Sequence, residues 1–414
     1  MGVDVVRASA RAGRVVLWEE SPRDGAQAKT LMTPDFRVRL ARAQGRIFGG
    51  DGPRHVVFAA GFPAVCPEEF EAVRRVAVEA EGAVSVSAVC RGTATDVRQA
   101  LASVRGTAHA RIMVIVPASE AMAGVMTHGT AEQALLGGAA LVAEALAADD
   151  TVAVDVCLAD ASRADHALVG EHAARLTEAG AGVVVLADTV GDQLPEDAAA
   201  MFATLRRRAG DDVVLASHLH NDLGLALANS LQALRAGVRV HSSSWLGIAE
   251  RSGMVATEQL LFLLAYRPDR TRALLGDDRD AWWTAPDLTL LPGIARMVAA
   301  ETGAPLGVTT PIVGDGVGTI STGTPFVHPR LFEPYDPLGL LGIEPRVVLT
   351  HLASARVVRA VAARLGHDLD ADRTRTAVTW VKSRAYDQGH AVVDDDDFAD
   401  YLSALAVPAA RTPR

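Results

Sequence analysis

A regular alternation of strand-like and helix-like segments constrains the fold of this chain most strongly. Eight short runs rich in β-branched residues are each followed by a helix-like stretch, and together they cover about 290 of the 414 residues. Eight successive βα units predict a parallel (β/α)8 (TIM) barrel of the α/β class, with active residues at the carboxyl ends of the strands. The predicted strands are 14–20, 54–60, 83–89, 110–116, 151–157, 181–188, 212–218 and 238–245.

The residues after the first strand argue against the main alternative, a doubly wound open sheet. That fold usually carries a glycine-rich fingerprint directly after its first strand. Here the stretch reads "EESPRDGAQ", which is not such a fingerprint.

The pattern changes after about Asp287. A helix-like stretch is followed by sequence rich in Gly and Pro, and helical patterning then returns. We therefore expect a barrel over 1–290, a linker over 291–344 and a small helical extension over 345–414. Acidic residues within Val392–Leu405 are more typical of a helix N-terminus than of a metal site, because the helix dipole favours carboxylates there.

The composition limits the molecules that this chain is expected to bind and the compartment in which it is expected to work. The net charge of −10 disfavours nucleic acids and anionic membranes. No apolar run reaches the roughly 18 residues of a membrane span, and the N-terminus lacks the apolar segment of a signal peptide. The three cysteines form no CxxC pair, which favours a reducing compartment. We expect a cytoplasmic protein.

Two histidines lie at the end of the seventh predicted strand. His218 and His220 are two residues apart, so their side chains point to the same face. This spacing alone fits metal ligands and packed core histidines equally well. Arg23 and Asp24 follow the first strand, at the same end of the barrel. Arg-Asp-Gly alone is common in turns, but its combination with His-x-His predicts a metal site with one carboxylate ligand.

Longer motifs then occur in a fixed order along the chain, and they carry a resemblance. The sequence resembles the pyruvate-carboxylate-transferase-type barrels, which include the 2-isopropylmalate, homocitrate and citramalate synthases, Re-type citrate synthase and hydroxymethylglutaryl-CoA lyase. The matching motifs include "SPRDGAQ", "AAGFPAVCPEEFEAVRRVA", "VCRGTATDV", "DASRAD", "LADTVGDQLPED", "HLHNDLGLALANSLQALRAGV", "GIAERSG", "ATEQLL" and "LFEPYDP".

The resemblance implies a role for each matching residue. Asp24, His218 and His220 would bind a divalent cation such as Mg²⁺, Mn²⁺, Co²⁺ or Zn²⁺, and Arg23 would stabilise the developing negative charge. Arg163 could equally form an exposed ion pair. The implied substrate-binding residues are Gln27, Arg91, Ser119, Arg163 and Thr189.

Five positions depart from the family pattern, where glutamate, histidine or asparagine is usual. They are Ala59, Met113, Ala159, Met254 and, in the extension, Ile320. Glu250, within "GIAERSG", is the candidate with matching context to replace the lost acid–base groups as a catalytic residue; the others are His128, Asp160 and His351. Lys29 lies beyond the strand end, and nothing in the sequence suggests a Schiff-base role for it.

Two functions follow from the resemblance, and the five departures from the family pattern leave a third open. The first is a metal-dependent Claisen-type acyltransferase that joins acetyl-CoA to a 2-oxo acid, giving an isopropylmalate-, homocitrate- or citrate-like product, or one from phosphonopyruvate, in specialised metabolism. The second is a metal-dependent carbon–carbon lyase, and the third is a binding protein without catalysis. Related synthases commonly form homodimers, so we expect one here.

Overall fold

The computed structural model describes residues 4–276 and 278–406. The chain forms two compact units, which divide between Leu306 and Gly307. The first unit holds a closed barrel of eight parallel strands, in which β1 pairs with both β2 and β8. The predicted (β/α)8 barrel is therefore confirmed. Its strands are β1 (Val16–Glu19), β2 (Val56–Gly61), β3 (Ser85–Arg91), β4 (Arg111–Pro117), β5 (Ala153–Ala159), β6 (Val184–Asp188), β7 (Leu215–Leu219) and β8 (Val240–Ser243).

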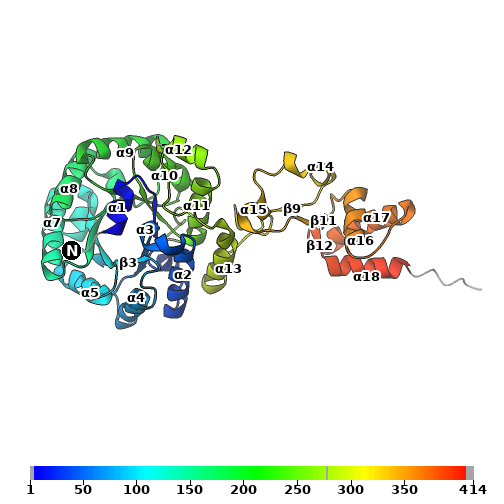
Figure 1. Cartoon of the computed structure of the whole chain (residues 1–414), viewed down its shortest axis with the longest axis horizontal. Coiled ribbons are helices and arrows are strands. Elements are labelled where there is room, and N and C mark those ends of the chain that lie inside the picture. The colour runs from blue at the N-terminus through cyan, green and yellow to red at the C-terminus, as the bar shows by residue number, and fades with distance from the viewer. Residues whose placement is uncertain (1–3, 277, 407–414) are drawn as a thin grey trace, which may run out of the picture. The chain divides into compact units, whose positions relative to one another are not determined.

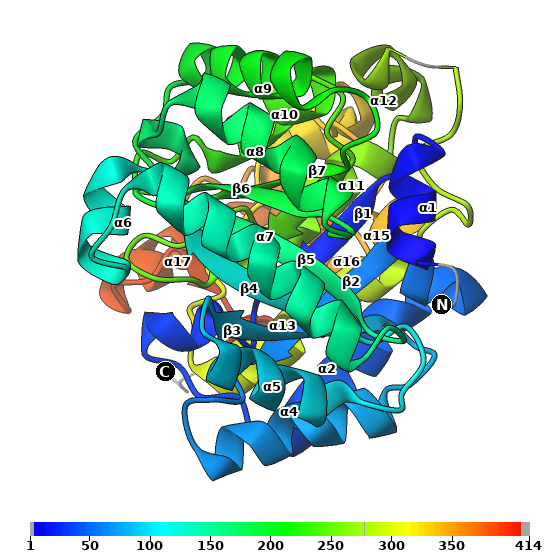
Figure 2. The same ribbon diagram turned by 90° about the vertical axis from the view of Figure 1, so that its left-hand side faces the viewer.

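Helices surround these strands, as Figures 1 and 2 show. Several begin at a threonine whose hydroxyl accepts a backbone N–H, as Thr33, Thr93 and Thr130 do. The helices are α2 (Pro34–Arg46), α3 (Gly52–His55), α4 (Pro67–Glu79), α5 (Ala94–Val104), α6 (Glu120–Met126), α7 (Ala131–Ala148), α8 (His166–Glu178), α9 (Pro195–Ala209), α10 (Ala226–Arg235), α11 (Thr257–Ala265) and α12 (Pro268–Leu275). Short 3₁₀ turns lie between them: η1 (Gly25–Ala28), η2 (Gly49–Asp51), η3 (Ala161–Arg163) and η4 (Trp245–Gly247).

A short helix before the first strand, α1 (Val5–Arg11), covers the amino-terminal end of the barrel. Its Val6 and Ala10 belong to the same core cluster as the inward residues of the strands. In Figure 1 this helix, in dark blue, lies inside the ring of outer helices.

Side chains alternate between the barrel interior and the surrounding helices, as expected for strands. Trp18, Ala59, Met113 and Ala216 belong to the inner cluster. Glu20 comes two residues after Trp18, and His218 two residues after Ala216. The polar residues at the carboxyl end therefore continue the inward rows that begin deeper in the barrel.

The division of the chain differs from the expected boundary at 290/291. After η5 (Leu288–Leu290), helix α13 (Leu291–Thr302) buries Leu291, Ile294 and Val298, and it contacts α2 and η4 of the barrel unit. This burial places α13 with the barrel, so the expected linker over 291–344 is shared between the two units.

The second unit has its own hydrophobic core, which includes Val357, Val361, Val381 and Phe398. The acidic run lies in the first turn of α18, as its predicted role at a helix N-terminus requires. The elements are β9 (Thr319–Ile320), α14 (Gly323–Val327), η6 (Pro329–Leu331), α15 (Pro337–Leu341), β10 (Arg346–Val347), β11 (Leu349–Thr350), α16 (Ala355–Arg364), α17 (Ala371–Asp387), β12 (Val392–Val393) and α18 (Asp395–Ala406).

One helix of the barrel unit, α7, would be long and apolar enough to cross a membrane by length and composition alone. It contacts β4, β5 and α8, which makes it one of the helices that cover the barrel.

Candidate metal centre and its surroundings

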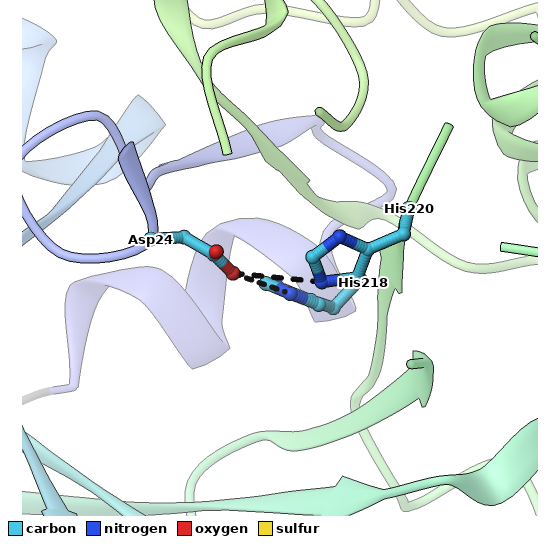
Figure 3. Close-up of side chains that lie close together, drawn as sticks. All are labelled: Asp24, His218 and His220. Carbon is cyan, nitrogen blue, oxygen red and sulfur yellow. Dashed lines mark ion pairs between the residues drawn. The ribbon is translucent and has the colours of Figure 1, made fainter. Parts of the chain in front are cut away.

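Three buried side chains meet at the carboxyl end of β1 and β7. The Oδ2 atom of Asp24 lies 3.1 Å from Nε2 of His218 and 3.6 Å from Nε2 of His220. One ligand atom from each residue lies within 4.8 Å of the other two. Figure 3 shows the Asp24 carboxylate facing both imidazoles. The structure thus brings together the three residues that the sequence proposed as metal ligands.

The donor set fits a divalent cation. Ligand atoms about 2.1 Å from one ion lie roughly 3.0–3.4 Å apart in octahedral or tetrahedral geometry, close to the 3.1 and 3.6 Å between Asp24 and the two histidines. Two imidazole nitrogens and one carboxylate oxygen suit zinc and first-row transition ions. The other oxygen of Asp24, Oδ1, accepts the Glu250 backbone N–H at 3.3 Å. That contact orients the carboxylate with Oδ2 toward the histidines.

The surroundings adjust the pKa values of these groups. Burial would raise the pKa of Asp24, but Arg23 and the two histidines hold it well below its usual range. Burial would lower the pKa of His218, but hydrogen bonding to Asp24 and the negative charges of Glu20 and Asp24 outweigh burial and raise it to about 8. Burial and the neighbouring His218 lower the pKa of His220 to about 4. The Asp24 carboxylate and the neutral His220 ring are therefore in ligand form at neutral pH.

Arg23 lies against the same group of side chains. Its Nε donates to Oε2 of Glu20 at 2.8 Å, and its Nη1 lies 3.4 Å from Oδ2 of Asp24. The side chain is 9% exposed, so its position next to the cluster is fixed by these two carboxylates. A guanidinium held in this way can place positive charge beside a reacting oxygen.

Three of the predicted substrate-binding residues surround Asp160 instead of standing free. Ser119 donates its hydroxyl to Oδ2 of Asp160 at 2.5 Å, and Arg163 donates to both oxygens at 2.7 and 3.0 Å. The Asp160 backbone N–H donates to Oγ1 of Thr189 at 2.8 Å. The Thr189 hydroxyl keeps its own hydrogen for another acceptor, whereas the Asp160 carboxylate already accepts from Ser119 and Arg163.

The remaining predicted residues lie at the rim. Gln27 is exposed in η1. Arg91 is 61% exposed and forms an ion pair with Asp96 at 2.6 Å. The side chain of Glu250 is half exposed and pairs with Arg251 at 3.2 Å, so its backbone N–H is the part that touches the cluster.

The departures from the family pattern leave apolar groups near the centre. Met113 is fully buried and faces inward with Ala59, while Ala159 ends β5. Met254 is buried, and its backbone forms a bridge with His220. Of the remaining candidates, His128 and Lys29 are exposed on the barrel unit. Ile320 and His351 belong to the second unit.

Sequence reasoning missed two further features of this end of the barrel. The first is Glu20, which contacts Arg23 and faces His218. Two adjacent glutamates inside a buried strand were the available signal, because opposite faces of the strand must accommodate them. The second is Arg251, which donates to Asp222 and to the Thr189 carbonyl and so connects the loops after β6, β7 and β8.

Comparisons with known proteins agree with this architecture. The model of the HMGL-like family matches residues 14–298. The chain is 35% identical over 259 residues to the 2-isopropylmalate synthase of Solidesulfovibrio magneticus, covering 62% of this chain and 49% of that protein. It is 28% identical over 389 residues to the enzyme of the same name from Nitrosospira multiformis, covering 92% and 73%.

Solved structures share the fold at lower identity. HMG-CoA lyase from Bacillus subtilis has a TM-score of 0.55 and 20% identity, over 71% of this chain and 95% of that chain. The carboxyl transferase domain of Rhizobium etli pyruvate carboxylase, solved with pyruvate and biocytin, has a TM-score of 0.51 and 17% identity, over 93% and 62%.

Proposed function

Because the chain belongs to the HMGL-like family, we propose that it is a divalent-metal-dependent acyltransferase that condenses acetyl-CoA with a 2-oxo acid. The observation that carries this proposal is the meeting of Asp24, His218 and His220 next to the buried Arg23. The similar proteins named as 2-isopropylmalate synthases support the same reaction class.

In the proposed reaction, one C–H bond of the acetyl methyl group breaks and its carbon bonds to the keto carbon. The keto oxygen takes up a proton, and water then cleaves the thioester to release the CoA thiol. A divalent ion held by Asp24, His218 and His220 would supply Lewis acidity toward the keto acid.

The chain's own residues would bind and orient the substrate. Arg23 would stabilise negative charge on the keto oxygen, because Glu20 and Asp24 hold its guanidinium in place before the substrate arrives. Thr189 would donate its free hydroxyl hydrogen to the substrate carboxylate, with its oxygen oriented by the Asp160 N–H.

The surroundings also favour one class of 2-oxo acid. Three cations toward the rim, Arg91, Arg163 and Arg251, are each paired with an aspartate. The inner wall presents Ala59 and Met113. A second anionic group on the substrate would have to displace these aspartates from the arginines. A 2-oxo acid with a small or apolar side chain therefore fits better.

A thiol-release assay tests the proposal. Purified protein is incubated with acetyl-CoA, a divalent ion and a panel of 2-oxo acids with apolar, carboxylate and phosphonate side chains. We expect metal-dependent release of CoA thiol, fastest with an apolar member. No thiol release across the panel would overturn the proposal, and cleavage of 3-hydroxy acids without thiol release would favour the lyase.

We further propose that the protein acts as a cytoplasmic homodimer, the state that its resemblance to the synthases implies. Light scattering coupled to gel filtration measures the mass directly. A mass of one chain, 43.4 kDa, at assay concentrations that support full activity would contradict the dimer.

A further inference from the structure

Glu20 is a buried carboxylate that lies between the two functional groups of the candidate site. Its side chain is 0% exposed. Oε2 accepts the Arg23 Nε–H at 2.8 Å, and Oε1 lies 3.6 Å from Nδ1 of His218. Within the described residues, neither Oε1 of Glu20 nor Nδ1 of His218 has a hydrogen-bond partner. A buried acceptor and a buried ring nitrogen that face each other without other partners are complementary groups.

The backbone holds Glu20 in this position. Its N–H donates to the Ser243 carbonyl at 2.8 Å, and its own carbonyl accepts the N–H groups of Arg23, Asp24 and Gly25. Glu20 therefore directly follows β1 and begins the turn that carries Arg23 and Asp24. Its side chain has little freedom to leave the site.

The strand register shows which neighbour Glu20 faces. Glu19 lies opposite Phe58 on β2, which places Glu20 at the level of Ala59, and both inward rows point into the barrel. Ala59 offers no polar side-chain atom there. At this level the residue that follows β1 supplies a carboxylate, whereas β2 presents only the methyl group of Ala59.

We propose that Glu20 is a positioning residue for the metal centre and for Arg23. Its Oε1 would accept the Nδ1–H of His218 and thereby fix the tautomer that leaves Nε2 free to coordinate a cation. Histidines that bind metals commonly donate their second ring N–H to a carboxylate in this way. The other oxygen keeps Arg23 directed at the same centre, so a single side chain couples the ligand to the guanidinium.

This inference rests on the proposed metal centre but not on the identity of the 2-oxo acid, so metal binding tests it without activity. In the full chain, Glu20→Gln is titrated with Zn²⁺ and with Co²⁺, and the visible absorption of bound Co²⁺ reports ligand geometry. A glutamine amide has a single oxygen, so it cannot accept hydrogen bonds from Arg23 and His218 on two separate oxygens as the carboxylate can. We expect metal affinity to fall roughly 10–100-fold, with an altered Co²⁺ spectrum.

Glu258→Gln is the control, because Glu258 is equally buried and its carboxylate accepts the Leu246 N–H instead of facing a ligand. Both variants are first checked for wild-type circular dichroism. Wild-type affinity and spectrum in Glu20→Gln, or an equal loss in Glu258→Gln, would overturn the role of Glu20. If the wild-type chain itself binds no ion, the proposed metal centre fails together with this inference.

Discussion

Arg23 offers the sharpest test of a single side chain in the proposed chemistry. Its planar group contacts Glu20 through Nε and Asp24 through Nη1, a geometry that a lysine cannot reproduce. We expect Arg23→Lys to lower kcat about 10²–10³-fold, as removal of an oxyanion donor does, while metal affinity changes little. Steady-state kinetics at saturating metal measure the effect. Arg98→Lys on the exposed face of α5 is the control, and wild-type kcat in Arg23→Lys would contradict the assignment.

Glu258 makes the stability of the folded chain depend on pH. Burial raises the pKa of Glu258 to about 7, with a further contribution from the charge of Glu19. Between pH 4.5 and 7 the folded chain therefore keeps a proton that the unfolded chain loses. The contribution of Glu258 to the free energy of unfolding falls as the pH rises through this range. Glu258→Gln removes that cost, and we expect it to narrow the difference in free energy of unfolding between pH 5 and pH 8 by up to about 3 kcal/mol.

Urea unfolding at the two pH values checks this expectation. The comparison is made with the wild type, because Glu19, whose pKa is also raised to about 7, contributes in both proteins. An identical pH dependence in the variant and the wild type would show that Glu258 does not carry the effect.

At the candidate site, the metal ligands could be predicted from the sequence, but the hydrogen bonds among the substrate-binding residues could not. His218 and His220 were found because strand spacing and barrel topology together fix which way they point. The contacts of Ser119, Arg163 and Thr189 around Asp160 could not be found in that way. They depend on the left-handed conformation of Asp160, at φ 62°, and on side-chain rotamers.

Among the elements, α1 and the strands beneath it are joined by a buried cluster of charges. Arg111 at the start of β4 donates to Asp155 on β5 at 2.7 and 2.9 Å, and it contacts Asp4, the N-cap of α1. Removing the cation would leave a buried carboxylate without its partner, which costs about 3–5 kcal/mol. We expect Arg111→Met to lose that much stability while metal affinity stays unchanged, because the metal centre lies at the other end of the strands.

Chemical unfolding and metal titration of the same variant separate the two effects. Arg208→Met provides a matched control, since its ion pair with Glu171 is exposed and should contribute less than about 1 kcal/mol. A stability loss in Arg111→Met no larger than in this control would contradict the buried cluster.

The elements themselves were largely predictable. All eight strands lie within or next to their predicted runs, because fully buried parallel strands produce continuous β-branched sequence. Helix α1 was not predicted, since seven residues before the first strand carry too little periodicity to distinguish a helix. Its role became clear only from Val6 and Ala10, which complete the core of the barrel.

In the whole molecule, the two units have separate hydrophobic cores, and all three candidate ligands belong to the first. We therefore expect calorimetry to resolve two transitions. A divalent ion at 100 to 1,000 times its Kd should stabilise only the barrel transition, by about 3–4 kcal/mol. Val361→Ala, in the core of the second unit, should lower only the other transition. A single transition that moves with either change would contradict independent units.

The boundary between these units was less predictable than the barrel. Gly- and Pro-rich sequence marks a change in structure, but α13 precedes it and packs on the barrel through Leu291, Ile294 and Val298. Tertiary contacts of one amphipathic helix decide which unit it joins, and sequence periodicity alone does not show them.

We propose that this barrel joins an acetyl unit to a 2-oxo acid by means of a metal held by Asp24, His218 and His220. Mass spectrometry of the product formed from carbon-13 acetyl-CoA tests it most directly. We predict a labelled product equal in mass to the 2-oxo acid plus one carboxymethyl unit and hydrogen, formed one for one with free thiol. It should disappear with a chelator or in His218→Ala. Thiol release without that product, or formation of the product after complete removal of divalent ions, would contradict a metal-dependent condensation.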